Sequence, residues 1–414
     1  MIEFNRVVLD NGLRLIIHSD RYTPLATVNV LYDVGSKDEH PDSTGFAHLF
    51  EHLMFGGTVN IPEYDRHVQD AGGENNAFTS ADMTNYYISL PKKNLETALW
   101  LEADRMSGLA FSKKSLDVQR NVVIEEFKQS YLNQPYGDVM LLLRPLAYKV
   151  HPYRWNTIGK DISHIEKVQM DEVKAFFKTW YNPSNAVLSI AGNVDKDEVI
   201  RYAEKWFSVI EPGKNNRREL PEEPRQVEGR KMTVTRNVPY TALIKAYHMP
   251  ARLEKDYHTC DLISDILSNG QSSRLYNKLF KEKKMFSEIN AYISGSHDRG
   301  LFIINGLITQ GVDIEEAETA LNEELSVLFT EAVGENELQK VKNKVESSLI
   351  LSYTDIRIKA LNLAIYELLG DASLINTDII KYREVSIDDV KRVSGQLFRP
   401  ANCSTLYYLS DDKK

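Results

Sequence analysis

An internal repeat constrains the fold of this chain more than any other feature of its sequence. The segment Asp171-Glu172-Val173-Lys174, followed by Asn182-Pro183-Ser184-Asn185, recurs with identical spacing as Asp388-Asp389-Val390-Lys391 and Arg399-Pro400-Ala401-Asn402. An apolar, strand-like stretch comes next in both copies, at 186–191 and at 404–409. Self-similarity at a fixed separation predicts two homologous halves, each of which closes with a helix and then a strand.

The residues near the middle of the chain are typical of a linker. Residues 211–229 are rich in prolines, glycines and mixed charges, and their apolar residues follow neither a helical nor a strand periodicity. We therefore expect an N-terminal domain over 1–210, a linker over 211–229 and a homologous C-terminal domain over 230–414. The total of 414 residues agrees with two domains of ordinary size, since typical domains have roughly 100–200 residues.

Local patterns predict an α+β fold. The turn Asp10-Asn11-Gly12 separates two apolar runs, and Asn-Gly tolerates the positive φ values of a hairpin, so the chain should begin with antiparallel strands. Further strands are expected at 26–34, 76–79, 85–90 and 186–191, and helices at 45–55, 95–106, 113–129 and 171–180. We predict two homologous α/β halves, each an antiparallel-rich sheet covered by helices.

Composition excludes several classes of protein. The net charge of −9 is spread along the chain without a basic stripe, which argues against a nucleic-acid partner. The two cysteines, Cys260 and Cys403, belong to no C-x-x-C pair, so a metal site must use histidines and carboxylates. The chain contains neither a signal-peptide pattern nor an apolar run as long as a membrane span. We therefore expect a cytoplasmic protein without a membrane partner.

The segment His48-Leu49-Phe50-Glu51-His52 carries the clearest chemical signal. Residues three and four apart lie on one face of a helix, so His48 and His52 project side by side with Glu51 next to them. Two imidazoles one turn apart can each give a nitrogen to Zn²⁺, and Glu51 is placed as general base to take a proton from the attacking water. The alternative is that the histidines are close by chance. The apolar neighbours favour a metal site, because they bury the helix and buried histidines need partners.

The repeat places a second helix opposite this one. Ala47–Met54 aligns with Cys260–Leu267, and the apolar positions match. The polar positions differ, because Asp261, Ser264 and Asp265 stand in place of the two histidines and the glutamate. We expect the C-terminal domain to keep the helix as scaffold and to lack the metal motif.

A catalytic zinc has three protein ligands, so a third must come from elsewhere in the chain. The predicted helix 113–129 offers the best candidate, because its apolar face, defined by Leu116, Val122, Val123 and Phe127, includes Glu126 and excludes Glu125. The alternative role for Glu126 is a salt bridge to a buried arginine. Gln119 lies two turns earlier on the same face, and we expect it to form hydrogen bonds around the site.

At this point the chain resembles a known family. The inverted H-x-x-E-H motif, the segment Gln119-Arg120-Asn121-Val122-Val123-Ile124-Glu125-Glu126 and the segment Gly73-Glu74-Asn75-Asn76-Ala77-Phe78-Thr79-Ser80 together resemble the inverzincins, which include pitrilysin, insulin-degrading enzyme and mitochondrial processing peptidase. The resemblance covers essentially the whole chain. It implies that His48, His52 and Glu126 bind zinc and that Glu51 is the general base. It also implies that Asn76, Ala77, Phe78 and Thr79 form an edge strand on which an extended substrate is laid by β-augmentation.

The chain departs from the family pattern in two places. Family members often have Glu where this chain has Gln119. In many relatives the C-terminal half supplies an Arg and a Tyr that hold the substrate or stabilise the oxyanion, but Phe280 and Ser287 occupy those positions here. Because some short members work as pairs, the resemblance implies that this chain is the zinc-bearing subunit of a heterodimer with a homologous Arg/Tyr-bearing partner. A homodimer without that pair is the alternative.

The resulting prediction is a zinc metalloendopeptidase that hydrolyses peptide bonds in peptides or unfolded polypeptide segments. Two competing functions stay open. The chain could be a non-catalytic scaffold or assembly subunit of a peptidase-like complex, against which the intact His48, Glu51, His52 and Glu126 argue. It could also hydrolyse a non-peptide bond, against which the strand Asn76–Thr79 argues.

Overall fold

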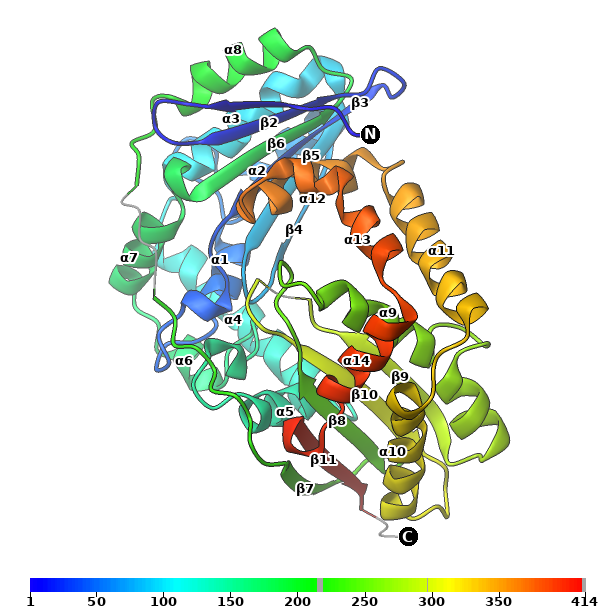
Figure 1. Cartoon of the computed structure of the whole chain (residues 1–414). Coiled ribbons are helices and arrows are strands. Elements are labelled where there is room, and N and C mark those ends of the chain that lie inside the picture. Colours follow the sequence, from blue (N-terminus) through cyan, green and yellow to red (C-terminus); the bar gives the residue numbers. More distant parts are fainter. Residues whose placement is uncertain (214–218, 296, 412–414) are drawn as a thin grey trace. The chain divides into compact units, whose positions relative to one another are not determined.

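A computed structural model of the chain describes residues 1–213, 219–295 and 297–411, which group into two compact units (Figure 1). The first unit comprises Met1–Gln129, Trp155–Leu220 and Ile350–Thr377. The second comprises Ser130–Arg154, Pro221–Leu349 and Asp378–Lys414. Residues 214–218 of the predicted linker 211–229 lie outside the described residues.

The strands of the first unit form one mixed sheet. Their order across the sheet is β1 (Asn5–Val8), β2 (Arg14–Ser19), β6 (Ala186–Gly192), β3 (Leu25–Tyr32), β5 (Thr84–Pro91) and β4 (Glu74–Thr79). The pairing of β2 with β6 is parallel, and the other pairings in this sheet are antiparallel. Strand β4 therefore lies at an edge of the sheet.

The sheet of the second unit repeats this arrangement. Its order is β7 (Arg230–Arg236), β11 (Cys403–Ser410), β8 (Ala242–His248), β10 (Leu301–Ile308) and β9 (Phe286–Ile293). Here too one pairing, β7 with β11, is parallel and the rest are antiparallel. The strands β2, β6, β3, β5 and β4 thus correspond in position and direction to β7, β11, β8, β10 and β9. The predicted α+β class and the two homologous halves are confirmed.

Helices cover both sheets. In the first unit they are α1 (Phe46–Leu53), α2 (Tyr64–Asp70), α3 (Leu95–Ser107), α4 (Lys113–Phe127), α6 (Ile162–Glu166), α7 (Met170–Trp180), α8 (Lys196–Phe207) and α12 (Ile356–Leu368). In the second they are α5 (Val139–Ala147), α9 (Tyr257–Ser268), α10 (Ile314–Thr330), α13 (Asp378–Glu384), α14 (Ile387–Leu397) and most of α11 (Glu335–Ser352), whose last residues from Ile350 onward belong to the first unit. Among the described residues, no helix is both long and apolar enough to span a bilayer.

The hairpin at the start of the chain forms where the sequence predicts it. The N–H of Gly12 donates to the carbonyl of Leu9, and Gly12 adopts a φ of 87°. The side-chain amide of Asn11 donates to the carbonyls of Phe207 and Ile210, and its oxygen accepts the N–H of Leu13 in the turn. This asparagine therefore ties the hairpin to the end of α8.

Each compact unit contains one segment from the other half of the sequence. Helix α12 packs on the first sheet, where Leu363 and Ala364 share a core with Ile16, Leu31 and Val187. Reciprocally, α5 packs against β7, β8 and β11 of the second sheet. The domain boundaries 1–210 and 230–414 stay a prediction about the repeated halves of the sequence. The compact units do not coincide with these halves, because residues 130–154 belong to the second unit and residues 350–377 to the first.

We expect Leu363→Ala to destabilise the first unit. Leu363 is fully buried between α12 and the sheet, and truncating a buried leucine costs about 2–5 kcal/mol through lost burial and the cavity left behind. Urea unfolding followed by circular dichroism measures the change. The matched control is Ile380→Ala, because Ile380 on α13 is 45 % exposed. Equal stability of the two variants would contradict the packing described for α12.

Candidate metal centre

Helix α1 owes its place to its apolar face. Phe46, Leu49, Phe50 and Leu53 are buried, and the ring of Phe50 stacks on Tyr181 with 5.0 Å between centroids. The observed bounds agree with the predicted helix 45–55 to within two residues. With that face buried, the polar side chains that remain point to the other side of the helix.

The N-terminus of α1 is held by a buried carboxylate. Gly45 begins the helix with a φ of 95°, and a Cβ on it would lie 2.8 Å from the carbonyl oxygen of Ile158. Since glycine has no side chain to cap the helix, the carboxylate of Glu39 accepts the N–H groups of Gly45 and Ala47, each at 2.8 Å. Burial raises the pKa of Glu39, and these hydrogen bonds oppose the rise. Sequence reasoning missed this residue, which lies in a polar loop without period.

Helix α4 carries the predicted third ligand. Ser112 caps the helix by accepting the N–H of Ser115, and Leu116, Val123 and Phe127 are buried. The prediction that Val122 belongs to the buried face is wrong, because this residue is 44 % exposed. The apolar face is narrower than predicted, yet Glu126 still turns toward α1.

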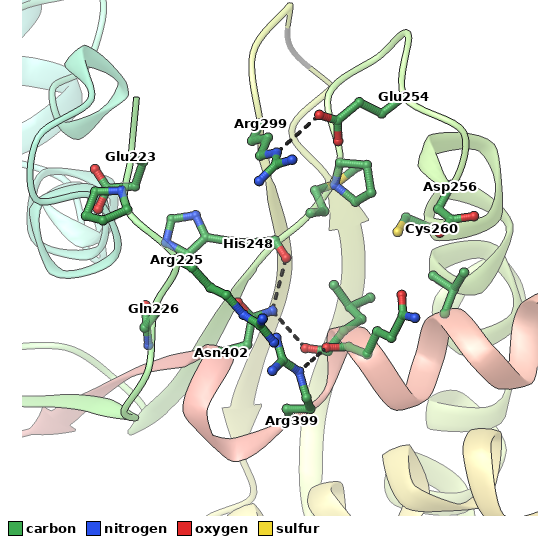
Figure 2. A pocket seen from close by; sticks show the side chains of 16 residues that line it. Glu223, Arg225, Gln226, His248, Glu254, Asp256, Cys260, Arg299, Arg399 and Asn402 are labelled. Atoms are coloured by element: carbon green, nitrogen blue, oxygen red, sulfur yellow. Dashed lines mark hydrogen bonds and ion pairs between the residues drawn. The ribbon is translucent and has the colours of Figure 1, made fainter. Parts of the chain in front are cut away.

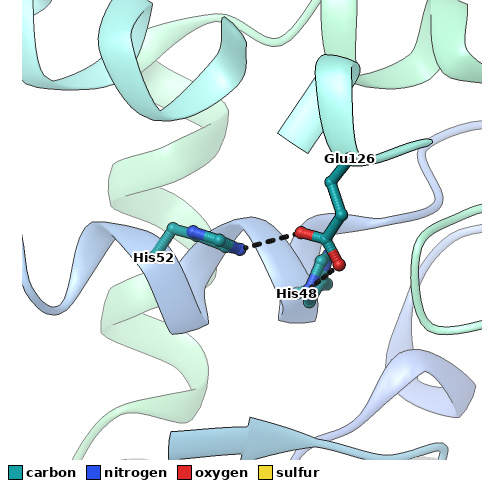
Figure 3. Close-up of side chains that lie close together, drawn as sticks. All are labelled: His48, His52 and Glu126. Atoms are coloured by element: carbon teal, nitrogen blue, oxygen red, sulfur yellow. Dashed lines mark ion pairs between the residues drawn. The ribbon is translucent and has the colours of Figure 1, made fainter. Parts of the chain in front are cut away.

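His48, His52 and Glu126 converge on one point of the first unit (Figure 3). The Nε2 atom of His48 lies 3.6 Å from one carboxylate oxygen of Glu126, and that of His52 lies 3.4 Å from the other. A direct hydrogen bond would be shorter, at about 2.9 Å. Ligands about 2.1 Å from a tetrahedral zinc are about 3.4 Å apart. The donor types and their spacing therefore fit zinc.

The protonation states that a metal requires are favoured by the surroundings. Burial lowers the pKa of His48, although the nearby Glu126 carboxylate opposes this shift. The neighbouring imidazole of His52 is the largest cause that holds the pKa of Glu126 below its usual value. A neutral imidazole and an ionised carboxylate are the forms that bind a metal. Glu126 is 42 % exposed, so the candidate site is open to solvent on the α4 side.

Glu51 lies between the two histidines in sequence and contacts strand β4. Its carboxylate oxygen Oε2 accepts a hydrogen bond of 2.6 Å from the hydroxyl of Thr79. The hydroxyl fixes the side chain of Glu51, while its second oxygen has no hydrogen bond in the described part of the chain. Thr79, the last residue of the predicted substrate strand, is thus hydrogen-bonded to Glu51, the predicted general base.

The open edge of β4 presents alternate backbone groups. The N–H of Ser80 donates to the carbonyl of Met83 at the turn into β5. Because hydrogen-bonded pairs alternate along an antiparallel ladder, the backbone groups of Asn76 and Phe78 also face β5, and those of Ala77 and Thr79 face outward. The N–H of Ala77 agrees with this pattern, since it donates to the side chain of Asn76 at 2.8 Å rather than to β5.

Three other predicted residues lie outside this cluster. Gln119 is half-buried on α4, and its side chain forms no hydrogen bond to the described residues, so its expected role stays a prediction. Phe280 stacks on Tyr276 with 4.9 Å between ring centroids. Ser287, on β9, donates to the carbonyl of Leu307. Both side chains lie in the second unit and are occupied by these contacts.

We expect Glu39→Ala to weaken the candidate metal centre. The variant leaves two buried N–H groups of α1 without an acceptor, which costs about 2–4 kcal/mol of stability. Because α1 carries two of the three ligands, zinc affinity should fall as well. Thermal unfolding and competition for zinc against a chelator measure the two effects. Glu63→Ala is the control, because Glu63 is exposed and pairs with Arg66. Wild-type zinc affinity in Glu39→Ala would contradict the role given to this cap.

Comparison with known proteins accords with this geometry. The family model described as Insulinase (Peptidase family M16) matches residues 14–154, and the one described as Peptidase M16 inactive domain matches residues 167–345. The zinc protease PqqE of Helicobacter pylori is 28 % identical over 97 % of this chain and 91 % of its own length. The probable mitochondrial-processing peptidase subunit beta of Arabidopsis thaliana is 24 % identical over 83 % of this chain and 66 % of its own.

Solved structures agree in fold. The crystal structure of a protease from Helicobacter pylori superposes with a TM-score of 0.91, at 28 % identity, and covers 99 % of this chain and 100 % of that one. The two family models together account for both homologous halves, and the first of them contains the complete H-x-x-E-H segment and Glu126. The chain therefore belongs to peptidase family M16, the insulinase family.

Proposed function

We propose that this protein is a zinc-dependent endopeptidase that hydrolyses peptide bonds in peptides or unfolded polypeptide segments. The spacing of 3.4–3.6 Å between the histidine nitrogens and the carboxylate oxygens of Glu126 carries the proposal, since it suits ligands around one zinc ion. The relative from Helicobacter pylori is named a zinc protease, which supports the same chemistry.

In this proposal each polar side chain of the centre has one task. His48, His52 and Glu126 hold the metal, which when bound supplies Lewis-acid polarisation of the scissile carbonyl and makes water more acidic. Glu51 takes the proton of the attacking water and passes it to the amine that leaves. Thr79 keeps the Glu51 carboxylate turned toward the ligands through the 2.6 Å hydrogen bond.

The substrate is an extended peptide paired with the open edge of β4. Ala77 and Thr79 offer their outward N–H and C=O groups, which bind a main chain whatever its side chains are. Asn76 occupies the N–H of Ala77 in the free protein and swings away when the peptide binds. Phe78, whose side chain is 36 % exposed, then packs beside the bound strand. A peptide bond is favoured over other hydrolysable bonds because only a polypeptide pairs with a strand in this way.

A partner subunit completes the site. The positions at which the family pattern has Arg and Tyr hold Phe280 and Ser287, and neither side chain supplies a cation or a phenol for an oxyanion. The relative from Arabidopsis is named as a subunit, which supports a divided enzyme. A homologous Arg/Tyr-bearing chain is the proposed partner, and a homodimer is the alternative. A scaffold role is the competing function, favoured by the match of residues 167–345 to an inactive domain.

We expect Glu51→Gln to abolish hydrolysis while the protein keeps its zinc. The amide retains the size of the side chain but takes up no proton, and loss of a general base typically costs a factor of about 10²–10⁴. Hydrolysis of a library of unstructured peptides, with metal content measured by elemental analysis, provides the test. His52→Ala is the matched control, because it should lose both zinc and activity.

The same assay, repeated with an Arg/Tyr-bearing partner, separates the remaining alternatives. Activity of the wild-type chain alone would remove the need for a partner, whereas activity only with the partner supports the divided site. Absence of hydrolysis in both assays, despite bound zinc, would favour the scaffold function. Equal activity of Glu51→Gln and wild type would remove Glu51 from the mechanism.

We expect Thr79→Val to lower kcat by roughly tenfold, which is the size of a hydrogen bond to a charged group. Valine keeps the shape and the strand preference of threonine but cannot donate to Glu51. Thr79→Ser, which restores the hydroxyl, should recover most of the activity. The Michaelis constant should change little, because the backbone edge of β4 is intact in both variants. A loss confined to the Michaelis constant would show instead that Thr79 acts through substrate binding.

A further inference from the structure

A cavity of about 350 Å³ lies in the second unit and is lined by no residue of the metal centre (Figure 2). The segment Glu223–Gln226, the end of β8 with the residues after it, and the turn between α14 and β11 surround it. Its volume is within the range of cavities that hold small molecules. Pro224, Pro250, Val393 and Leu397 provide apolar walls, so the charged side chains that line it determine what it can bind.

The carboxylates of this cavity are already engaged. Glu223 accepts the N–H groups of three successive residues, Lys149, Val150 and His151, at 2.8–2.9 Å. Glu254 pairs with Arg299, and Asp256 accepts two hydrogen bonds of 2.8 Å from Arg392. Each negative charge thus has a partner within the protein and adds little repulsion toward an anion.

Two of the three arginines of the cavity lack a carboxylate. Neither Arg225 nor Arg399 forms an ion pair with any residue that the structure describes, although Nε of Arg399 donates to the carbonyl of Gln396. Both side chains line the cavity, and Figure 2 shows them converging from the linker segment and from the turn after α14. Two guanidinium groups without a carboxylate partner, from the exposed Arg225 and the half-buried Arg399, therefore line the same solvent-open cavity.

The other titratable groups of the cavity are neutral. Burial raises the pKa of the Cys260 thiol to about 12 and lowers the pKa of His248. The thiol is accordingly neither a nucleophile nor a metal ligand at neutral pH. The chemistry on offer is anion binding by arginine.

We propose that this cavity binds the phosphate group of a small organic molecule between Arg225 and Arg399. A guanidinium fork matches phosphate oxygens in pairs, and a phosphate monoester has three terminal oxygens and a charge of about −1.5 to −2, enough for two forks. A single carboxylate has two oxygens and one charge, and satisfies one fork. The apolar walls take the organic part of the ligand.

Binding would join two segments of the second unit. Arg225 comes from the linker segment, two residues after the Glu223 clamp on 149–151, and Arg399 follows α14. A phosphate held by both arginines restrains the linker segment against the turn. Slower amide exchange at 223–226 and 399–402 is the local signature of this restraint.

Calorimetric titration of the whole chain with inorganic phosphate, glycerol phosphate and acetate, at equal ionic strength, tests the proposal. We expect saturable binding of one phosphate or phosphate ester per chain, tighter for the ester, and at least tenfold weaker binding of acetate. Hydrogen exchange with and without glycerol phosphate should show protection at 223–226 and 399–402.

Variants distinguish the site from general attraction of anions. Arg225→Gln with Arg399→Gln should weaken phosphate binding at least tenfold, and the two Arg→Lys changes, which keep the charge without the fork, should weaken it less. Arg66→Gln with Arg201→Gln removes the same charge from exposed positions of the first unit and should leave binding unchanged. Unfolding curves of the free variants verify their folding. Binding that is unsaturable, equal for acetate and phosphate, or equal in the two double glutamine variants would overturn the proposal.

Discussion

The candidate centre depends on how firmly one short helix is held. Helix α1 has eight residues and would not be stable alone, because isolated helices of that length do not overcome the cost of nucleation. Two constraints replace length: the buried aromatic and aliphatic face, and the Glu39 carboxylate at the N-terminal N–H groups. Because neither constraint involves the polar face of the helix, both leave His48, Glu51 and His52 available for chemistry.

In the second half of the chain, the homologous helix α9 has other polar residues where α1 has its two histidines. On α9 the residues aligned with the histidines are Asp261 and Asp265, and burial raises the pKa of both. Asp261 accepts a hydrogen bond from Tyr382, and Asp265 accepts one from Asn269, which in turn accepts one from the ammonium group of Lys344 on α11. A lysine thus supplies the positive charge near this face. Helix α9 packs in the core of the second unit through buried residues that include Leu262, Ile263 and Ile266.

Local periodicity was sufficient for the parts of the site that lie on regular elements. The i, i+4 spacing placed both histidines on one face, and the helical wheel chose Glu126 over Glu125, which is exposed and pairs with Lys128. The helical wheel wrongly predicts that Val122 is buried. Three buried residues, Leu116, Val123 and Phe127, are enough to anchor α4, and Val122 is exposed to solvent. Glu39 could not be predicted in this way. Its role arises from a loop that folds back on a helix end, and the sequence carries no period for such a contact.

For a related reason, the sequence does not predict that α5 and α12 each pack on the sheet of the other half. An amphipathic pattern shows that a helix buries one face, but it does not say which sheet the helix covers. In α12, Leu363 and Ala364 complete the core of the first sheet even though the repeat assigns them to the second half. Since β2, β6 and β3 are buried on the face that α12 covers, the first half lacks part of its own core when residues 350–377 are removed. The two halves of the sequence are therefore one folding problem, because the sheet of the first unit takes part of its core from a helix that the second half supplies.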